Sequence, residues 1–302
     1  MNNGPLAAAE VAHRVKASER GIQLLLDALQ AIGYVQQQGD RYSNTPMTAK
    51  WMVRSSPHYV AEMFPYMDDV LEIWGNLEEA IRKGETPVLT WEWLDKHPDG
   101  WDKYNGAMVA MARMAASEVI TKVKLPVTAR RLLDVGGSHG LYAINFCSRY
   151  PDLSATILDG PATRKLAEAN IAAAGMEKRV SFREGDFWTD DLGSGYDVAL
   201  MFNIVHMYLP DKNIELLQKV GGVLNPGGMI VIMDQMATPA SAPTAKAMAG
   251  LNGLNLFVNV NGQTYPPKDV GDWLRQAGLT DPGEIFLRKS PGIALVVGTK
   301  TG

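Results

Sequence analysis

The sequence contains very little cysteine: Cys147 is the single thiol among 302 residues. One thiol excludes an intramolecular disulfide framework and a cysteine-cluster metal site, and it favours a reducing, cytoplasmic setting. The histidines, aspartates and glutamates do not show metal-ligand spacing either. We therefore expect a cytoplasmic protein that uses no metal.

Long apolar runs and an excess of basic residues are also absent. No stretch approaches the ~18 uninterrupted apolar residues of a membrane span, and the N-terminus lacks the basic start and apolar run that export requires. The 29 Lys and Arg against 33 Asp and Glu give a net charge of −4, which offers no general attraction to nucleic acid or anionic membranes. We expect neither a nucleic-acid-binding nor a membrane protein.

The first part of the chain resembles the tail of a winged-helix unit. An Ala-rich helix is predicted over residues 6–15, and a second helix runs from Ser18 as N-cap to Gly33 as stop signal. Residues 34–45 are predicted to form a β-hairpin with Gly39 and Asp40 at its turn. The second helix and the hairpin offer only one arginine each, so this unit is expected to form a dimer rather than bind DNA.

Residues 57–123 form a predicted helical region rich in methionine and aromatic side chains. At helical spacing such residues are usually core, but together they also suit the wall of a pocket for a flat or hydrophobic ligand. The candidates for contact with a small-molecule acceptor in this region are Tyr104, Met108 and Met111.

From residue 125 onward, short β-rich runs alternate with helical runs. This alternation predicts an α/β fold, a mostly parallel, doubly wound sheet of the Rossmann-like kind. The last two strands are separated only by residues 289–292, so we expect them to pair antiparallel. We expect two domains, a helical dimerisation and substrate-lid domain over 1–124 and a ligand-binding domain over 125–302.

The segment LLDVGGSHGLYAINF has an apolar strand, a glycine-rich turn and the start of a helix. Gly136, Gly137 and Gly140 let the backbone turn tightly and approach a ligand without interference from Cβ atoms. The G-x-G-x-x-G spacing of a dinucleotide site fails, and Asp134 before the glycines would repel a pyrophosphate. A ligand with an amino group and a positive centre, S-adenosylmethionine, fits better than NAD.

Two more acids follow the next two predicted strands. Asp159 is placed to accept hydrogen bonds from both ribose hydroxyls, and Asp186 to accept one from an adenine amino group, with Phe187 or Trp188 packed on the ring. Because the carboxyl ends of parallel strands meet at one edge of a sheet, the three acids predict one binding site.

At these residues the sequence resembles the S-adenosylmethionine-dependent small-molecule O-methyltransferases of the caffeate and hydroxyindole type, including bacterial polyketide and pigment methyltransferases of secondary metabolism. The resemblance extends over nearly the whole chain, from ERGIQLLLDALQAIGYV through LLDVGGSHG to GQTYPPKDVGDWLRQAGL. It implies a partial winged-helix dimerisation domain, a Rossmann-like methyltransferase domain and a homodimer. Family members usually have additional N-terminal residues that interlock two subunits, so the dimer is expected to use the helices present here. The resemblance implies cofactor contacts from Asp134, Gly136, Gly137, Gly140, Asp159, Asp186, Phe187 and Phe202.

The resemblance also places a general base at His206. An imidazole titrates near neutrality and can take the proton of a phenolic or enolic hydroxyl. Met207 stands where the family usually has Asp, and it is a candidate acceptor contact. Where plant members hold the histidine with two glutamates, this chain offers Asn255 and Asn252 to orient the acceptor or His206, and neither can take a proton.

We therefore predict methyl transfer from S-adenosylmethionine to a hydroxyl of an aromatic or polyketide-like molecule, without a metal. Methyl transfer to carbon is the nearest alternative, because such a substrate needs less proton removal. Relatives that use bound S-adenosylmethionine for non-methylating chemistry are a second alternative. The non-enzymatic alternative is a winged-helix regulator, which would bind duplex DNA in a salt-dependent way.

Overall fold

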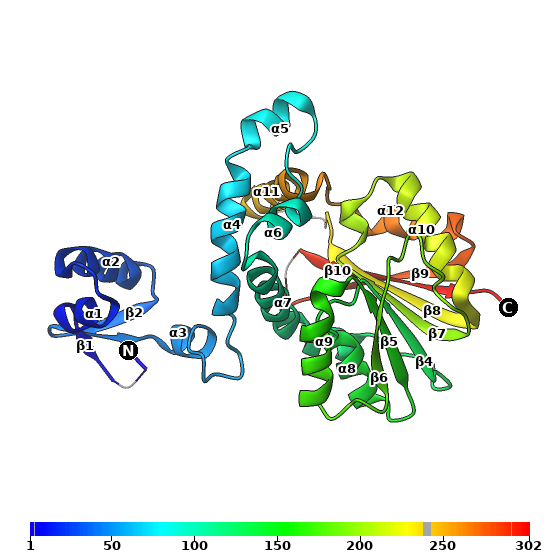
Figure 1. Cartoon of the computed structure of the whole chain (residues 1–302), viewed down its shortest axis with the longest axis horizontal. Helices are drawn as coiled ribbons and strands as arrows, with labels where there is room; N and C mark the ends of the chain where they lie inside the picture. Colours follow the sequence, from blue (N-terminus) through cyan, green and yellow to red (C-terminus); the bar gives the residue numbers. More distant parts are fainter. Residues whose placement is uncertain (3, 238–242, 291) are drawn as a thin grey trace. The chain divides into compact units, whose positions relative to one another are not determined.

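The structure is a computed structural model that describes residues 1–2, 4–237, 243–290 and 292–302. By its contacts the chain divides into a unit of Met1–Glu62 and a unit of Met63–Gly302, which are coloured by sequence in Figure 1. The helices between residues 63 and 122 thus make their contacts with the sheet unit. The predicted functional boundary at residues 124/125, where the sheet region begins, stays a prediction.

The first unit is a small sheet with two main helices. Its sheet order is β1-β3-β2, and the predicted hairpin is confirmed as β2 and β3. The helix expected from residue 6 begins at Ala8, because Leu6 and Ala7 extend and pair with Tyr42 and Arg41 of β3. Its elements are β1 Leu6–Ala7, α1 Ala8–Val15, α2 Glu19–Ala31, β2 Val35–Gln38, β3 Arg41–Asn44 and α3 Pro46–Trp51.

The predicted caps of α2 are confirmed. The Ser18 hydroxyl accepts a hydrogen bond from the Gly21 amide at 3.3 Å, and Gly33 follows the helix with a φ of 81°. Ile22 and Leu26 on the inner face of α2 pack with Ala12 and Tyr42. This small core holds the unit together.

The predicted helical region contains one short 3-10 turn and four α-helices. They are η1 Ala61–Met63, α4 Phe64–Trp74, α5 Leu77–Lys83, α6 Thr90–Lys96 and α7 Gly100–Lys122. Tyr104 of α7 contacts the rings of Tyr66, Trp91 and Trp101 edge-on at centroid distances of 5.3 to 5.8 Å. This aromatic cluster joins α4, α6 and α7 in one small core.

The second unit contains a seven-stranded sheet with the order β6-β5-β4-β7-β8-β10-β9. Strands β4 to β8 pair parallel, and β10 pairs antiparallel with both β8 and β9, as predicted for the last two strands. The strands are β4 Arg131–Val135, β5 Ser154–Asp159, β6 Val180–Glu184, β7 Tyr196–Phe202, β8 Leu224–Gln235, β9 Leu279–Phe286 and β10 Ile293–Lys300. The predicted doubly wound α/β fold is confirmed.

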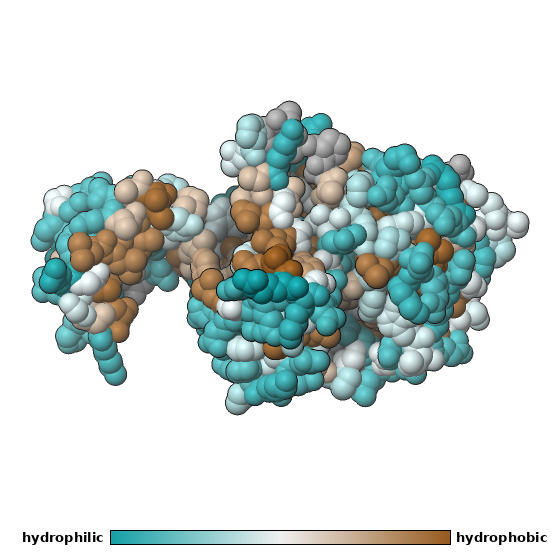
Figure 2. Space-filling view, turned by 90° about the horizontal axis from the view of Figure 1, so that it is seen from above, coloured by the Kyte–Doolittle hydropathy of each residue, from teal (hydrophilic) through white to brown (hydrophobic). Residues whose placement is uncertain are grey.

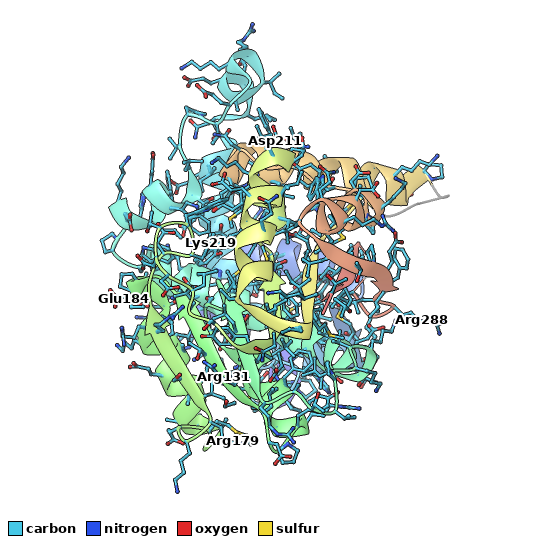
Figure 3. The ribbon with its side chains drawn as sticks, turned by 90° about the vertical axis from the view of Figure 1, so that its right-hand side faces the viewer. Arg131, Arg179, Glu184, Asp211, Lys219 and Arg288 are labelled. Atoms are coloured by element: carbon cyan, nitrogen blue, oxygen red, sulfur yellow. The ribbon has the colours of Figure 1, made fainter. Side chains whose placement is uncertain are left out.

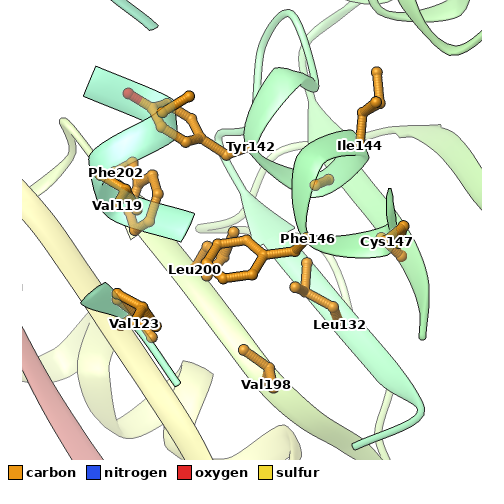
Figure 4. Close-up of a cluster of buried hydrophobic side chains, with 14 of the residues drawn as sticks. Val119, Val123, Leu132, Tyr142, Ile144, Phe146, Cys147, Val198, Leu200 and Phe202 are labelled. Atoms are coloured by element: carbon orange, nitrogen blue, oxygen red, sulfur yellow. The ribbon is translucent and has the colours of Figure 1, made fainter. Parts of the chain in front are cut away.

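Helices cover both faces of this sheet, and each face has its own apolar core. One core joins α7, α8 (Leu141–Arg149) and α9 (Pro161–Ala173) to strand side chains such as Leu132 and Leu200, with Phe146 of α8 among them (Figure 4). The other joins α10 and α12 to Leu133, Met201 and their neighbours. The remaining elements of this unit are α8 Leu141–Arg149, α9 Pro161–Ala173, the 3-10 turn η2 Val205–Met207, α10 Pro210–Val223, α11 Pro243–Val260 and α12 Pro267–Gln276.

None of the described helices is long and apolar enough to cross a membrane. Within the described ranges no group of three or more His, Cys, Asp or Glu side chains is arranged to hold a metal ion.

Candidate active site

The glycine-rich loop connects the carboxyl end of β4 to the start of α8. Gly136 and Gly140 have φ angles of 64° and 70°, which glycine adopts without a steric penalty. A Cβ at Gly137 would lie 2.6 Å from the Asp134 carboxyl group and 2.9 Å from Ile157. The loop is therefore packed against β4 and β5 as closely as glycine allows.

Asp134 lies directly behind this loop. Its side chain is 1% exposed, the Ala143 amide at the start of α8 hydrogen-bonds to it, and its Oδ2 is enclosed without a partner. Burial and the nearby charge of Asp159 raise the pKa of Asp134 to about 8. A cationic group brought to this loop would lower that pKa and stabilise the carboxylate.

Asp159 at the end of β5 is fastened to the same loop. Its Oδ2 accepts the Ser138 amide at 2.7 Å and its Oδ1 accepts the Gly160 amide at 2.6 Å. Burial raises its pKa, and these hydrogen bonds work in the opposite direction. Each carboxylate oxygen has a second lone pair, so Asp159 has capacity left for hydroxyl donors of a ligand.

The segment after β6 lies beside the loop as well. Phe187 is within 3.7 Å of the Cβ position of Gly136. Asp186 is exposed, and its Oδ1 accepts the Trp188 amide at 2.7 Å. Lys219 of α10, labelled in Figure 3, donates to the Trp188 carbonyl at 2.7 Å and holds the segment in place. The structure thus brings Phe187 to the glycines.

A histidine–aspartate pair lies at the carboxyl ends of β7 and β8, with His206 in the turn η2 after β7 and Asp234 near the end of β8. His206 Nδ1 is 2.7 Å from Asp234 Oδ1, and the His206 amide donates to Asp234 Oδ2 at 3.2 Å. The Gln235 amide donates to the same carboxylate at 2.7 Å. His206 and Asp234 are 8% and 1% exposed. Because the buried carboxylate accepts the Nδ1 proton, the Nε2 of His206 is left with its lone pair free to take a proton.

Asp234 is the site residue that the sequence analysis missed. The sequence analysis considered Asn255 and Asn252 as the residues that orient the histidine, yet Asp234 lies one residue before the end of β8, much as Asp159 ends β5. The rule that carboxyl ends of parallel strands meet at one edge, applied to MDQ after the long apolar run, would have found it.

Asn203, three residues before His206, is a second unpredicted feature of this edge. Its φ of 56° is left-handed, which asparagine tolerates better than most residues. Its amide donates to the Met233 carbonyl at 2.7 Å, and its side-chain Oδ1 is enclosed without a partner. The left-handed turn takes the chain out of β7 and into the segment that contains His206.

Asn255 belongs to a polar network on α11. Its Oδ1 accepts hydrogen bonds from Trp74 Nε1 at 2.9 Å and from Asn259 Nδ2 at 3.0 Å. Just after α11, the Gln263 amide donates to the His206 carbonyl at 2.9 Å. A Cβ at Gly262 would lie 2.2 Å from that carbonyl. The end of α11 is thus fastened to the backbone of His206.

The remaining candidates occupy different surroundings. Phe202 is 7% exposed and packs edge-on against Tyr142 at 4.7 Å in the core shown in Figure 4. Burial, with smaller effects of Tyr66 and Asp159, raises the pKa of Tyr104, whose ring belongs to the aromatic cluster of α4, α6 and α7. The half-buried candidates, whose roles stay predictions, are Met108, Met111, Met207 and Asn252.

Comparison with known families decides the class of this site. The model of the O-methyltransferase domain matches residues 74–280, more than half of the chain. The chain belongs to the O-methyltransferase family. The O-methyltransferase dimerisation domain matches residues 1–55. The assignment made from the sequence, to the S-adenosylmethionine-dependent O-methyltransferases, is confirmed.

Individual relatives are similar over most of their length. The chain is 28% identical over 318 aligned residues to the 3-hydroxy-5-methyl-1-naphthoate 3-O-methyltransferase of Streptomyces sahachiroi, with 98% of this chain and 86% of that protein covered. It is 26% identical over 292 residues to human acetylserotonin O-methyltransferase, with 92% and 83% covered. The structure of the human N-acetylserotonin methyltransferase in complex with S-adenosylmethionine has the same fold, with a TM-score of 0.86, 24% identity, and 99% and 88% coverage.

Proposed function

We propose that this O-methyltransferase methylates a hydroxyl group of an aromatic small molecule, with His206 as general base and Asp234 as its positioning residue. The observation that supports this proposal is the 2.7 Å contact between His206 Nδ1 and the buried Asp234 carboxylate. The carboxylate fixes the tautomer of the imidazole and stabilises the positive charge that arises when the ring takes a proton.

The proton is taken at His206 Nε2. A phenol loses its proton poorly at neutral pH, since its ordinary pKa is about 10. A base held within hydrogen-bonding distance removes that proton as the oxygen becomes a nucleophile, which is worth ~10²–10⁴ in rate. His206 is held on three sides, by Asp234 at its ring and amide and by Gln263 at its carbonyl, so the base is fixed before the acceptor binds.

The residues of the glycine-rich loop fit S-adenosylmethionine, which supplies an electrophilic methyl group when bound. The absence of Cβ atoms lets the loop pack directly on β4 and β5, and the unpartnered Oδ2 of Asp134 behind it favours a cation nearby. We assign the ribose hydroxyls to Asp159, the adenine to Asp186 and Phe187, and an apolar wall to Phe202.

The acceptor is proposed to be aromatic. The Streptomyces sahachiroi relative acts on a hydroxynaphthoate by its name, and another, from Streptomyces glaucescens, is named for tetracenomycin polyketide synthesis. Half-buried methionines suit such ligands because their side chains adapt to flat surfaces. We assign acceptor contacts to Tyr104, Met108, Met111, Met207 and Asn252, and acceptor orientation to Asn255.

We also propose that the enzyme is a homodimer formed through the first unit. Its surface exposes large apolar side chains that a monomer would leave in water, visible as brown areas in Figure 2. Leu24 and Leu25 of α2, and Ile32 just after the helix, are 52–65% exposed. Together with the match to the dimerisation domain, this face is suited to a second copy.

The proposal is tested by calorimetry and a methylation screen. S-adenosylmethionine and S-adenosylhomocysteine are titrated into the protein, with NADH as control. Phenolic and naphthol acceptors are then screened for a mass gain of one CH₂ unit. We expect binding of both adenosyl ligands, O-methylated products by NMR, and a ~10²–10⁴ loss of turnover in His206→Ala with unchanged ligand affinity. A product methylated on carbon would refute the hydroxyl acceptor. Normal turnover in His206→Ala would refute the role of His206 as base.

A further inference from the structure

The turn that contains His206 is weakly closed by its own backbone. It is the 3-10 turn η2, and its closing hydrogen bond, from the Tyr208 amide to the Val205 carbonyl, is long at 3.4 Å. Turns of this kind have poorer hydrogen-bond geometry than an α-helix. A displacement of ~1 Å can lower a catalytic rate about 10²-fold, so a turn that contains a general base must be held by other parts of the chain.

A buried side chain of α10 holds both ends of this turn. Asn213 is 0% exposed, and its Nδ2 donates to the Val205 carbonyl at 2.9 Å and to the Tyr208 carbonyl at 3.0 Å. Carbonyl oxygens only accept hydrogen bonds, so this end of the amide must be the NH₂ group. Helical side chains lean towards the N-terminus of their helix, and Asn213 therefore reaches back to the segment that precedes α10.

Stability alone does not explain an asparagine at this position. Its Oδ1 is enclosed and has no hydrogen-bond partner in the described part of the chain, and a buried acceptor without a partner is unfavourable. The other buried side chains of α10 are apolar: Leu216, Leu217 and Val220. A leucine at position 213 would extend this apolar face without an unpartnered oxygen, so the two hydrogen bonds that Asn213 donates are the property that distinguishes it.

A second side chain holds the same turn from the segment before α12. The Tyr265 hydroxyl donates to the Tyr208 carbonyl at 2.8 Å, and the Tyr265 ring packs edge-on against Trp273 at a centroid distance of 4.7 Å. The Tyr208 carbonyl thus has two side-chain donors, and the Val205 carbonyl also has the Tyr208 amide. Removal of the Asn213 amide would leave neither carbonyl without a partner, so we expect such a variant to fold.

We propose that Asn213 and Tyr265 are positioning residues for the general base, which fix the backbone turn from which the His206 ring extends. Asp234 orients the ring itself, and the two positioning residues keep that ring opposite the carboxylate. This inference rests on the proposed function, because it requires His206 to be the base.

The first test measures amide hydrogen exchange in the ligand-free protein. Asn213→Leu keeps a branched side chain of similar size and removes both donated hydrogen bonds. We expect the amides of residues 206–208 to exchange about tenfold faster than in the wild type, because the turn then depends more on its own long hydrogen bond. Peptides from β4 and α8 should exchange as in the wild type, which separates local loosening of the turn from a general loss of stability.

Asn225→Ala is the matched control for this measurement. The Asn225 Nδ2 donates to Asp197 Oδ1 at 2.7 Å, at the end of the sheet opposite the histidine. Its replacement also removes an asparagine donor next to α10, but the exchange of residues 206–208 should not change.

The second test measures initial rates with 2-naphthol as the acceptor probe. We expect Asn213→Leu to lower kcat by roughly 10–10²-fold, with the KM for 2-naphthol and the affinity for S-adenosylhomocysteine unchanged. In a His206→Ala background the same substitution should have no further effect, since no base is left to position. A merely structural role would lower the rate by the same factor in both backgrounds.

Tyr265→Phe keeps the inference testable if Asn213→Leu does not fold. It removes only the hydroxyl and retains the ring that packs on Trp273. We expect faster exchange of residues 206–208 and a smaller loss of kcat than in Asn213→Leu, because Asn213 still holds the Tyr208 carbonyl. This loss should also disappear in the His206→Ala background.

The outcomes distinguish this inference from the proposed function. Wild-type exchange of the turn in the variants, an unchanged kcat, or an equal loss in the His206→Ala background overturns the inference while the base proposal stands. Normal turnover in His206→Ala overturns both. The exchange measurement needs no acceptor, so it decides the inference even if 2-naphthol is not methylated.

Discussion

The replacement of Asp234 by asparagine should lower turnover and leave cofactor binding intact. In the wild type the carboxylate lies 2.7 Å from His206 Nδ1, and the imidazole becomes positive when it takes the acceptor proton. Two unit charges ~4 Å apart attract by about 4 kcal/mol at an effective dielectric constant of ~20. Asparagine keeps a dipole but no charge, so we assign a loss of about 2–3 kcal/mol, or roughly 30–150-fold in kcat.

The assay measures initial rates at saturating S-adenosylmethionine with an acceptor found in the screen, and calorimetry with S-adenosylhomocysteine in parallel. Asp197→Asn is the control, because Asp197 also accepts two main-chain amides, at 2.7 and 3.0 Å, but at the opposite end of β7. It should change stability and not kcat. Since Asp234 acts through His206, the double variant of both residues should be no slower than His206→Ala alone. A normal kcat in Asp234→Asn, or additive losses in the double variant, would show that the carboxylate does not act on the base.

Three further predictions concern two residues of the same site and one buried carboxylate elsewhere in the second unit. Gly137→Ala places a methyl group 2.6 Å from the Asp134 carboxyl group and should abolish S-adenosylhomocysteine binding in calorimetry, where wild-type affinity would contradict the tight packing of the loop. Asp159→Ala should weaken the same binding by at least tenfold, because two hydroxyl acceptors are lost. Backbone hydrogen bonds from Arg288 and Lys289 hold the pKa of Glu118 at about 2. The charged Glu118 therefore stabilises the fold above its unfolded pKa of 4.5, and this stabilisation disappears as the pH falls towards 2. Melting temperatures of Glu118→Gln should differ from the wild type at pH 7 and converge with it in acid.

The parts of the fold that local chemistry determines could be predicted from the sequence. The capping serine of α2, the hairpin turn and the glycine-rich loop each depend on residues a few positions apart. The alternation of strands and helices restricts the sheet to a doubly wound topology, because crossovers of parallel strands are right-handed. The predicted start of α1 at residue 6 was wrong, because Leu6 and Ala7 pair with a strand that lies 34 or more residues away in the sequence.

The contacts that were missed in the site join distant segments. His206 of the turn η2 and Asp234 of β8 are 28 residues apart, and Trp74 and Asn255 are 181 residues apart. Neither hydrophobic periodicity nor a short sequence motif indicates a contact between residues so far apart in the sequence. The network of α11 could not be predicted because its asparagines have no pattern that distinguishes a ligand contact from a contact between helices.

The connection between α11 and His206 has a consequence for how this enzyme could be redesigned. The chain after the helix end meets the base through main-chain atoms, the Gln263 amide and the backbone of Gly262 against the His206 carbonyl. Main-chain contacts do not depend on which side chains the helix has further along. The preceding turns of α11 can therefore be exchanged to select a new acceptor while the base stays in place, so that substrate choice and proton removal can be engineered independently.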